Sequence, residues 1–120
     1  FKIVPDGWMG CNFQGQRHDV AIELELHLKN KARYQRSFNE YRYNSKLVAV
    51  WYLVATKSLG KRLNQLWLQG GGASVYFIWA VAKEVREDAL NATIYSDERT
   101  YRFTDLFSPL KQIPAPPARA

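Results

Sequence analysis

Apolar and polar residues alternate between positions 19 and 29 of the chain. The apolar residues share one parity (Val20, Ile22, Leu24, Leu26 and Leu28), and the polar residues share the other (Asp19, Glu23, Glu25, His27 and Lys29, with Ala21 among them). A period of two predicts a β-strand with one apolar and one polar face. Because the polar face holds two carboxylates only two residues apart (Glu23 and Glu25), followed by an imidazole and an ammonium, it is either a solvated surface or a metal-binding strand.

A second extended segment precedes this strand. Residues 2–11 have the composition of a strand that is interrupted by Pro5, and residues 12–17 form a polar stretch that contains a glycine. The pattern predicts an antiparallel hairpin with a turn between its two strands.

The period changes after Asn30. Tyr34, Phe38 and Tyr41 follow one another at i, i+4 and i+7, which predicts an amphipathic helix over residues 31–43. Such a stripe of aromatic residues is typical of a helix face that packs on a core.

Two continuous apolar runs follow, at residues 47–55 and 75–82. Runs of this kind predict strands that are buried on both faces, in the middle of a sheet covered by helices. The stripe Leu59, Leu63, Leu66 and Trp67 predicts a helix between them, capped by Thr56 or Ser58 and ended by Gly70–Gly72. Two short strands, at 92–95 and 100–103, complete an α/β fold with a mixed sheet flanked by helices.

Length and composition set the outer limits. The 120 residues suit a single domain, which we expect over residues 1–112, and the proline-rich residues 113–120 predict a tail or linker. The chain starts at Phe1 without an initiator methionine, so we expect it to be part of a longer protein. The single cysteine excludes an intrachain disulfide, and no apolar run is long enough to span a bilayer. We therefore expect a cytoplasmic protein without membrane insertion.

Positive charge is concentrated in one part of the chain. The formal net charge is +6, and six basic residues lie between positions 29 and 46 against the single acid Glu40. This balance favours an anionic partner, with DNA the first candidate. The candidate backbone contacts are Lys31, Arg33, Arg36 and Lys46, and the alternative is an ordinary solvated helix face.

The predicted hairpin brings acids together. Asp6, in the sequence Pro5-Asp6-Gly7, would approach Glu23 across the two strands, and Glu25 would join them around one point. Carboxylates this close repel one another, and a bound cation keeps them ionised. Ligation by oxygen alone suits Mg²⁺ or Mn²⁺, and such an ion can promote phosphodiester hydrolysis.

These motifs resemble the PD-(D/E)XK nuclease superfamily. Asp6 matches the motif aspartate and Glu23 the motif acid, while Glu25 stands at the usual lysine position, where some restriction enzymes also carry glutamate. The stretch IELELHLKNKARY further resembles MobC-type and replication-relaxation proteins, which nick and relax plasmid DNA during mobilisation. The resemblance implies a restriction-endonuclease-like fold, metal-dependent DNA nicking at a plasmid origin, an upstream DNA-binding domain and other mobilisation proteins as partners.

Two further residues are candidates for the catalytic set. Lys29 shares the polar face and would substitute for the missing lysine, although an extended strand places it about 13 Å beyond Glu25. His27 is a candidate general base or DNA contact, or else a plain surface residue. The seven tyrosines lack a neighbouring histidine cluster, so water is the expected nucleophile.

Two other functions stay open. The superfamily core normally begins with a helix and a strand ahead of the Pro-Asp strand, and Phe1 leaves no room for them. We expect these elements to lie upstream in the full protein, to be replaced by later strands, or to be absent. The glutamate at the lysine position also fits an inactive nuclease fold that binds DNA or protein. A purely structural interaction domain is the third interpretation.

Overall fold

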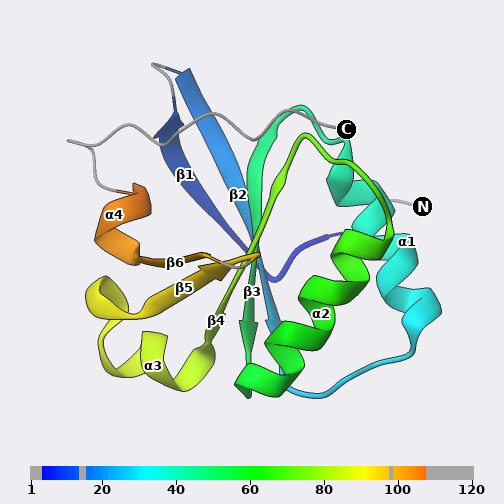
Figure 1. Cartoon of the computed structure of the whole chain (residues 1–120). Coiled ribbons are helices and arrows are strands. Elements are labelled where there is room, and N and C mark those ends of the chain that lie inside the picture. Colours follow the sequence, from blue (N-terminus) through cyan, green and yellow to red (C-terminus); the bar gives the residue numbers. More distant parts are fainter. Residues whose placement is uncertain (1–3, 14–15, 98, 108–120) are drawn as a thin grey trace.

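Six β-strands form one mixed sheet, and helices lie on both of its faces (Figure 1). The structure is a computed structural model that describes residues 4–13, 16–97 and 99–107. Its elements in chain order are β1 (Gly7–Phe13), β2 (Gln16–Glu25), α1 (Lys31–Arg42), β3 (Leu47–Val54), α2 (Lys57–Gln69), β4 (Tyr76–Val81), α3 (Ala82–Glu87), the 3-10 turn η1 (Ala89–Asn91), β5 (Thr93–Ser96), β6 (Arg99–Arg102) and α4 (Phe103–Phe107).

The order of strands in the sheet follows the chain from β1 to β6. β2, β3 and β4 run parallel, with α1 and α2 as the connections between them. β1 pairs antiparallel with β2, and β5 and β6 continue the sheet antiparallel beyond β4. The predicted α/β class with a mixed, helix-flanked sheet is confirmed. The restriction-endonuclease-like form of that sheet stays a prediction.

Most predicted elements lie close to the observed ones. The helix expected at residues 31–43 is α1, and the buried strands expected at 47–55 and 75–82 are β3 and β4. α3, η1 and α4 were not predicted, because they are too short to show a helical period. The predicted tail at residues 113–120 lies outside the described residues.

Two apolar layers cover the sheet, one on each face. The layer under α1 and α2 includes Ala21, Tyr34, Phe38, Tyr41, Val50, Tyr52, Leu63, Trp67 and Phe77. The opposite layer includes Val20, Ala49, Trp51, Ile78 and Ile94, with Val85 of α3 and Phe103 of α4 packed against it. β3 supplies residues to both layers, which explains why its sequence is apolar without alternation.

β2 differs from its prediction in length and in the burial of its faces. The strand ends at Glu25, four residues before the predicted end at Lys29. Beyond this point Leu26 and Leu28 are about half exposed, and so is Leu24 on the last part of the strand. Glu25 is only 7% exposed, because the carboxylate face of β2 turns toward α1. A solvated polar face is therefore wrong for Glu25.

A buried arginine joins the C-terminal ends of α1 and α2. Arg42 is 2% exposed, and its guanidinium donates hydrogen bonds to the Asn39 side chain and to the carbonyl of Trp67. It also lies 4.7 Å from the centre of the Trp67 ring. A cation is favourable at helix C-termini and over an aromatic face. This contact fixes α1, and with it one wall of the site described below.

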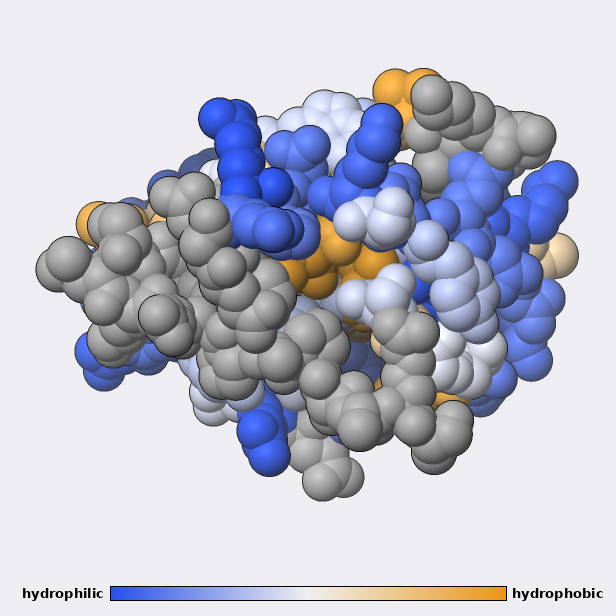
Figure 2. All heavy atoms as spheres, turned by 90° about the horizontal axis from the view of Figure 1, so that it is seen from above, coloured by the Kyte–Doolittle hydropathy of each residue, from blue (hydrophilic) through white to orange (hydrophobic). Residues whose placement is uncertain are grey.

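Figure 2 shows the end of the molecule that is uppermost in Figure 1. Among the coloured residues of this view, hydrophilic ones predominate and border a small apolar area. This surface agrees with a chain in which 23% of residues are charged.

Candidate functional site

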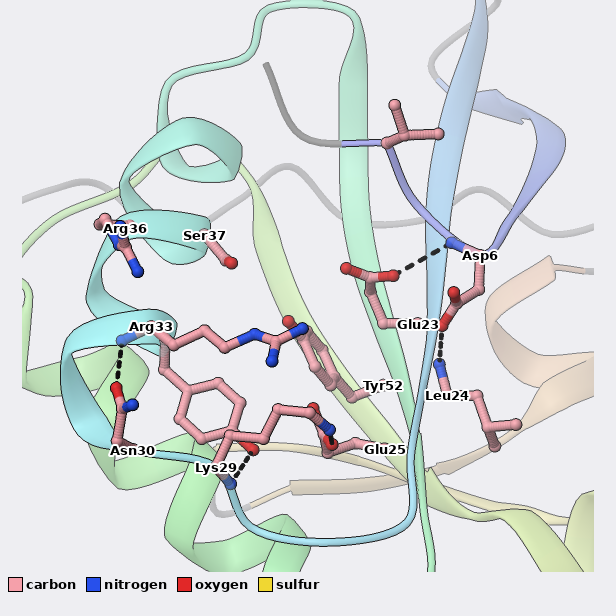
Figure 3. Close-up of a pocket in the computed structure, with 12 residues that line it drawn as sticks. Asp6, Glu23, Leu24, Glu25, Lys29, Asn30, Arg33, Arg36, Ser37 and Tyr52 are labelled. Atoms are coloured by element: carbon pink, nitrogen blue, oxygen red, sulfur yellow. Dashed lines mark hydrogen bonds and ion pairs between the residues drawn. The ribbon is translucent and has the colours of Figure 1, made fainter. Parts of the chain in front are cut away.

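The β1–β2 hairpin brings Asp6 and Glu23 together. Gly7 pairs with Ile22, so the next residues along the two strands are Asp6 and Glu23. The Asp6 backbone N–H donates to Glu23 Oε1 at 3.0 Å, and the Leu24 N–H donates to Asp6 Oδ2 at 2.8 Å (Figure 3). Each carboxylate thus accepts a backbone hydrogen bond where the strand ladder ends. The predicted approach of Asp6 to Glu23 is confirmed.

Glu23 lies in a partly buried position beneath α1. Its second oxygen, Oε2, accepts a hydrogen bond from the Tyr41 hydroxyl at 3.0 Å. Burial raises the pKa of Glu23 above its ordinary value, and the hydrogen bonds from Asp6 and Tyr41 oppose this shift only in part. The negative charges of Asp6 and Glu25 raise the pKa further. Burial and the two neighbouring carboxylates therefore both favour the protonated form of Glu23.

Glu25 is held by a lysine from its own segment. Lys29 Nζ lies 2.5 Å from Glu25 Oε1, and the Lys29 backbone N–H donates to the Tyr34 hydroxyl at 2.9 Å. The predicted separation of about 13 Å was wrong, because it assumed an extended strand up to Lys29. The strand ends at Glu25, and the chain then turns back toward α1. Lys29 thus neutralises Glu25 inside the site.

The opposite wall of the site is the first half of α1. Asn30 caps this helix by accepting the Arg33 N–H at 2.9 Å. Figure 3 shows the Arg33 side chain extending from α1 toward Tyr52, with Ser37 on the same side of the helix, and Arg36 also lines the pocket. Between the two walls is a pocket of about 740 Å³. Its lining residues are Val4, Asp6, Glu23, Leu24, Glu25, Lys29, Asn30, Arg33, Tyr34, Arg36, Ser37 and Tyr52.

The pocket is divided electrostatically. Once Glu25 and Lys29 neutralise each other, Asp6 and Glu23 remain on the hairpin wall and Arg33 and Arg36 on the helix wall. Neither arginine side chain has an ion pair or hydrogen bond among the described residues. The first turn of α1 contains no acid, so its cations lie at the positive end of the helix dipole. A bound anion would offset the electrostatic repulsion between these cations and the positive end of the helix dipole.

The carboxylates of the pocket could supply two ligands to a hard cation. Across residues 4–13, 16–97 and 99–107, no three histidine, cysteine or carboxylate side chains stand close enough to hold a metal ion by themselves. Mg²⁺ normally uses one or two carboxylates and completes its shell with water and phosphate oxygens. Asp6 and Glu23 meet that requirement. Glu25 would join them as a third ligand only after it separates from Lys29.

Three predicted site residues lie outside the pocket lining. His27 is exposed in the bend after β2, and Lys31 is exposed at the first position of α1. Lys46 precedes β3, where its carbonyl accepts the Asp19 N–H. The pocket lies at the other end of β3, so Lys46 is far from the acids.

Three tyrosines that were predicted to lie in the core belong to the site. Tyr34 and Tyr41 are buried on the α1 stripe, yet their hydroxyls contact Lys29 and Glu23. Tyr52 lies in register with Glu23 on the neighbouring strand and lines the pocket. The available signal was the composition of the α1 stripe, which places a hydroxyl on each side of Phe38. Tyrosines at the ends of a buried stripe indicate polar partners for their hydroxyls in the neighbouring segments.

No family model, no curated protein and no solved structure matches this chain. None of the helices in the described part of the chain has the length and apolar character needed to cross a membrane.

Proposed function

We propose that this domain is a metal-dependent DNA endonuclease of the nicking, relaxase type, which acts in plasmid mobilisation or replication relaxation. The observation that carries the proposal is the pocket in which hairpin acids face the arginines of α1. Such a pocket suits a cation on one wall and a phosphate on the other. The proposal includes the restriction-endonuclease-like form of the sheet.

Each group has a distinct role in this proposal. Asp6 and Glu23 would hold Mg²⁺ or Mn²⁺, and Arg33 and Arg36 would hold the DNA phosphate. A bound divalent cation supplies Lewis-acid polarisation of the phosphodiester. Lys29 balances the charge of Glu25 and orders the turn that leads into α1.

The remaining predicted residues would act at the edges of the site. Lys31 follows Asn30 and would contact a neighbouring phosphate. His27 and Lys46 lie outside the pocket lining, so DNA would reach them only along its flanking backbone. Their removal should change the salt dependence of binding more than the rate of nicking.

Nicking of supercoiled plasmid in the presence of Mn²⁺ tests the proposal. Asp6→Asn and Glu23→Gln keep an oxygen that accepts the backbone hydrogen bonds at these positions, but they remove the charge. We expect each variant to lose about 10²-fold or more in rate. Glu87→Gln, an exposed acid on α3, is the matched control and should nick like the wild type. Wild-type rates in both site variants would overturn the proposal.

A second candidate function is a nuclease-fold module without catalysis that binds DNA or protein. Its support is that both oxygens of Glu23, and one oxygen each of Asp6 and Glu25, already accept hydrogen bonds from the protein. Calorimetric titration with Mn²⁺ separates the two functions. Binding that disappears in Glu23→Gln supports the nuclease, whereas DNA binding without Mn²⁺ binding supports the module. Absence of DNA binding at low salt would favour a purely structural domain.

A further inference from the structure

Tyr52 is a buried residue that nevertheless forms part of the pocket. It lies on β3 in register with Glu23 and is only 2% exposed. Its ring packs against Phe38 and Phe77, with ring centres 5.7 and 5.4 Å apart. Figure 3 shows the side chain between the acids of β2 and Arg33 of α1. Tyr52 therefore contributes to the floor between the two charged walls.

The Tyr52 hydroxyl has no hydrogen-bond partner in the described part of the chain. The other two tyrosines of the pocket region differ, because Tyr41 donates to Glu23 and the Tyr34 hydroxyl accepts the Lys29 N–H. The hydroxyl is not among the buried polar atoms that lack a partner, so it opens into the pocket, where a ligand can reach it. The hydroxyl is thus a polar group whose partner the described protein does not supply.

The hydroxyl is also in its donor form. Burial raises the pKa of Tyr52, and the negative charges of Glu23 and Glu25 add to this shift. A tyrosine hydroxyl ordinarily carries its proton at neutral pH, and here it offers an O–H to the pocket. A partner must bring an acceptor oxygen to it.

We propose, on the basis of the nuclease function proposed above, that Tyr52 is a positioning residue whose hydroxyl donates a hydrogen bond to a phosphate oxygen. Arg33 and Arg36 complete this phosphate subsite from the helix wall. Two guanidinium groups that have no partner among the described residues match the oxygens of a phosphate, and the hydroxyl adds a directional donor at the floor. The ligand is a phosphate group, either free or within a nucleic-acid strand.

The test compares Tyr52→Phe with wild type in binding and in stability. The change removes one oxygen atom and leaves the ring contacts with Phe38 and Phe77 intact. We expect a thermal midpoint close to that of the wild type, together with about tenfold weaker binding of a short thymidine oligonucleotide. Tyr95→Phe is the matched control, since Tyr95 stacks on Trp79 and does not line the pocket. Its affinity for the oligonucleotide should equal that of the wild type.

A second pair of variants tests the helix wall. Arg33→Gln should weaken oligonucleotide binding, whereas Lys61→Gln, an exposed cation on α2, should change it much less. Competition with inorganic phosphate distinguishes the sources of the ligand. Competition at millimolar phosphate indicates that the anion alone is recognised, and its absence indicates recognition of the phosphodiester within a strand.

The outcomes separate this inference from the nuclease function. If the wild type nicks DNA, Tyr52→Phe should raise KM more than it lowers kcat, because the hydroxyl holds the ligand. Unchanged KM and unchanged oligonucleotide affinity in Tyr52→Phe would overturn the subsite and leave the nuclease intact. Weakened binding in a protein that does not nick would support the subsite and reject the nuclease. A wild type that binds neither oligonucleotide nor phosphate would also overturn the subsite.

Discussion

Replacing Arg42 by lysine should strongly destabilise the fold, although the charge is kept. The guanidinium forms two hydrogen bonds at the ends of α1 and α2, to the Asn39 side chain and the Trp67 carbonyl. An ammonium at the end of a linear chain cannot reach both acceptors in the planar geometry of the guanidinium. The variant keeps a buried cation and loses part of its partners.

The magnitude follows from the contacts that are lost. One hydrogen bond to a charged group contributes about 1.5–3 kcal/mol, and the contact over the Trp67 ring contributes about 1 kcal/mol. We therefore expect the free energy of unfolding to fall by about 3 kcal/mol. That is a large part of the total for a small domain, which is about 5–15 kcal/mol.

Urea unfolding followed by circular dichroism measures this change. Arg62→Lys, at an exposed position of α2, is the matched control and should shift the free energy of unfolding by less than about 0.5 kcal/mol. A loss below about 1 kcal/mol in Arg42→Lys would refute the reasoning. It would mean that Arg42 does not hold α1 and α2 together.

Two further predictions concern packing and pH. A Cβ atom at Gly60 would lie 2.2 Å from the Trp79 ring, so Gly60→Ala should lower the free energy of unfolding in urea by about 1–3 kcal/mol. At Gly7 an added Cβ would lie 3.7 Å from its nearest neighbour, so Gly7→Ala should not cause a comparable loss from overpacking. Equal losses in the two variants would contradict the role of Gly60 in close packing. The raised pKa of Glu23 means that its folded carboxyl binds a proton more tightly than its unfolded one, so its stabilisation is present below about pH 4.5 and is lost as pH rises through the folded pKa. Thermal unfolding should therefore show Glu23→Gln gaining stability over wild type between pH 4 and pH 7, and a constant difference would exclude the shift.

The sequence was sufficient to predict those features that follow from a local pattern of apolar and polar residues. Asp6 and Glu23 meet at the open end of the hairpin, because the antiparallel register of β1 and β2 continues as far as Gly7 and Ile22. α1 was predicted from its aromatic stripe within one residue of its true end. The apolar runs of β3 and β4 indicated central strands because only a doubly covered strand tolerates them.

The rest depended on tertiary contacts that the pattern does not contain. Nothing in the alternation marks the end of β2, since Leu26 and Leu28 continue it. The strand ends at Glu25 because its partner β3 ends at Val54, and this decides where Lys29 lies. The position of Tyr52 could not be predicted for a related reason. A continuous apolar run has no alternation, so it does not indicate on which face of the sheet a residue lies. Only the packing of α1 on the carboxylate face reveals that the Tyr52 hydroxyl reaches the pocket.

The central claim is that Asp6 and Glu23 together hold a divalent cation. The most direct measurement is anomalous diffraction from crystals soaked in Mn²⁺, because the scattering of the metal locates it independently of activity. The claim predicts an anomalous peak between the carboxylates of Asp6 and Glu23, which is absent in Glu23→Gln. A pocket without such a peak at saturating Mn²⁺, with both carboxylates still in their hydrogen bonds to the protein, would contradict it.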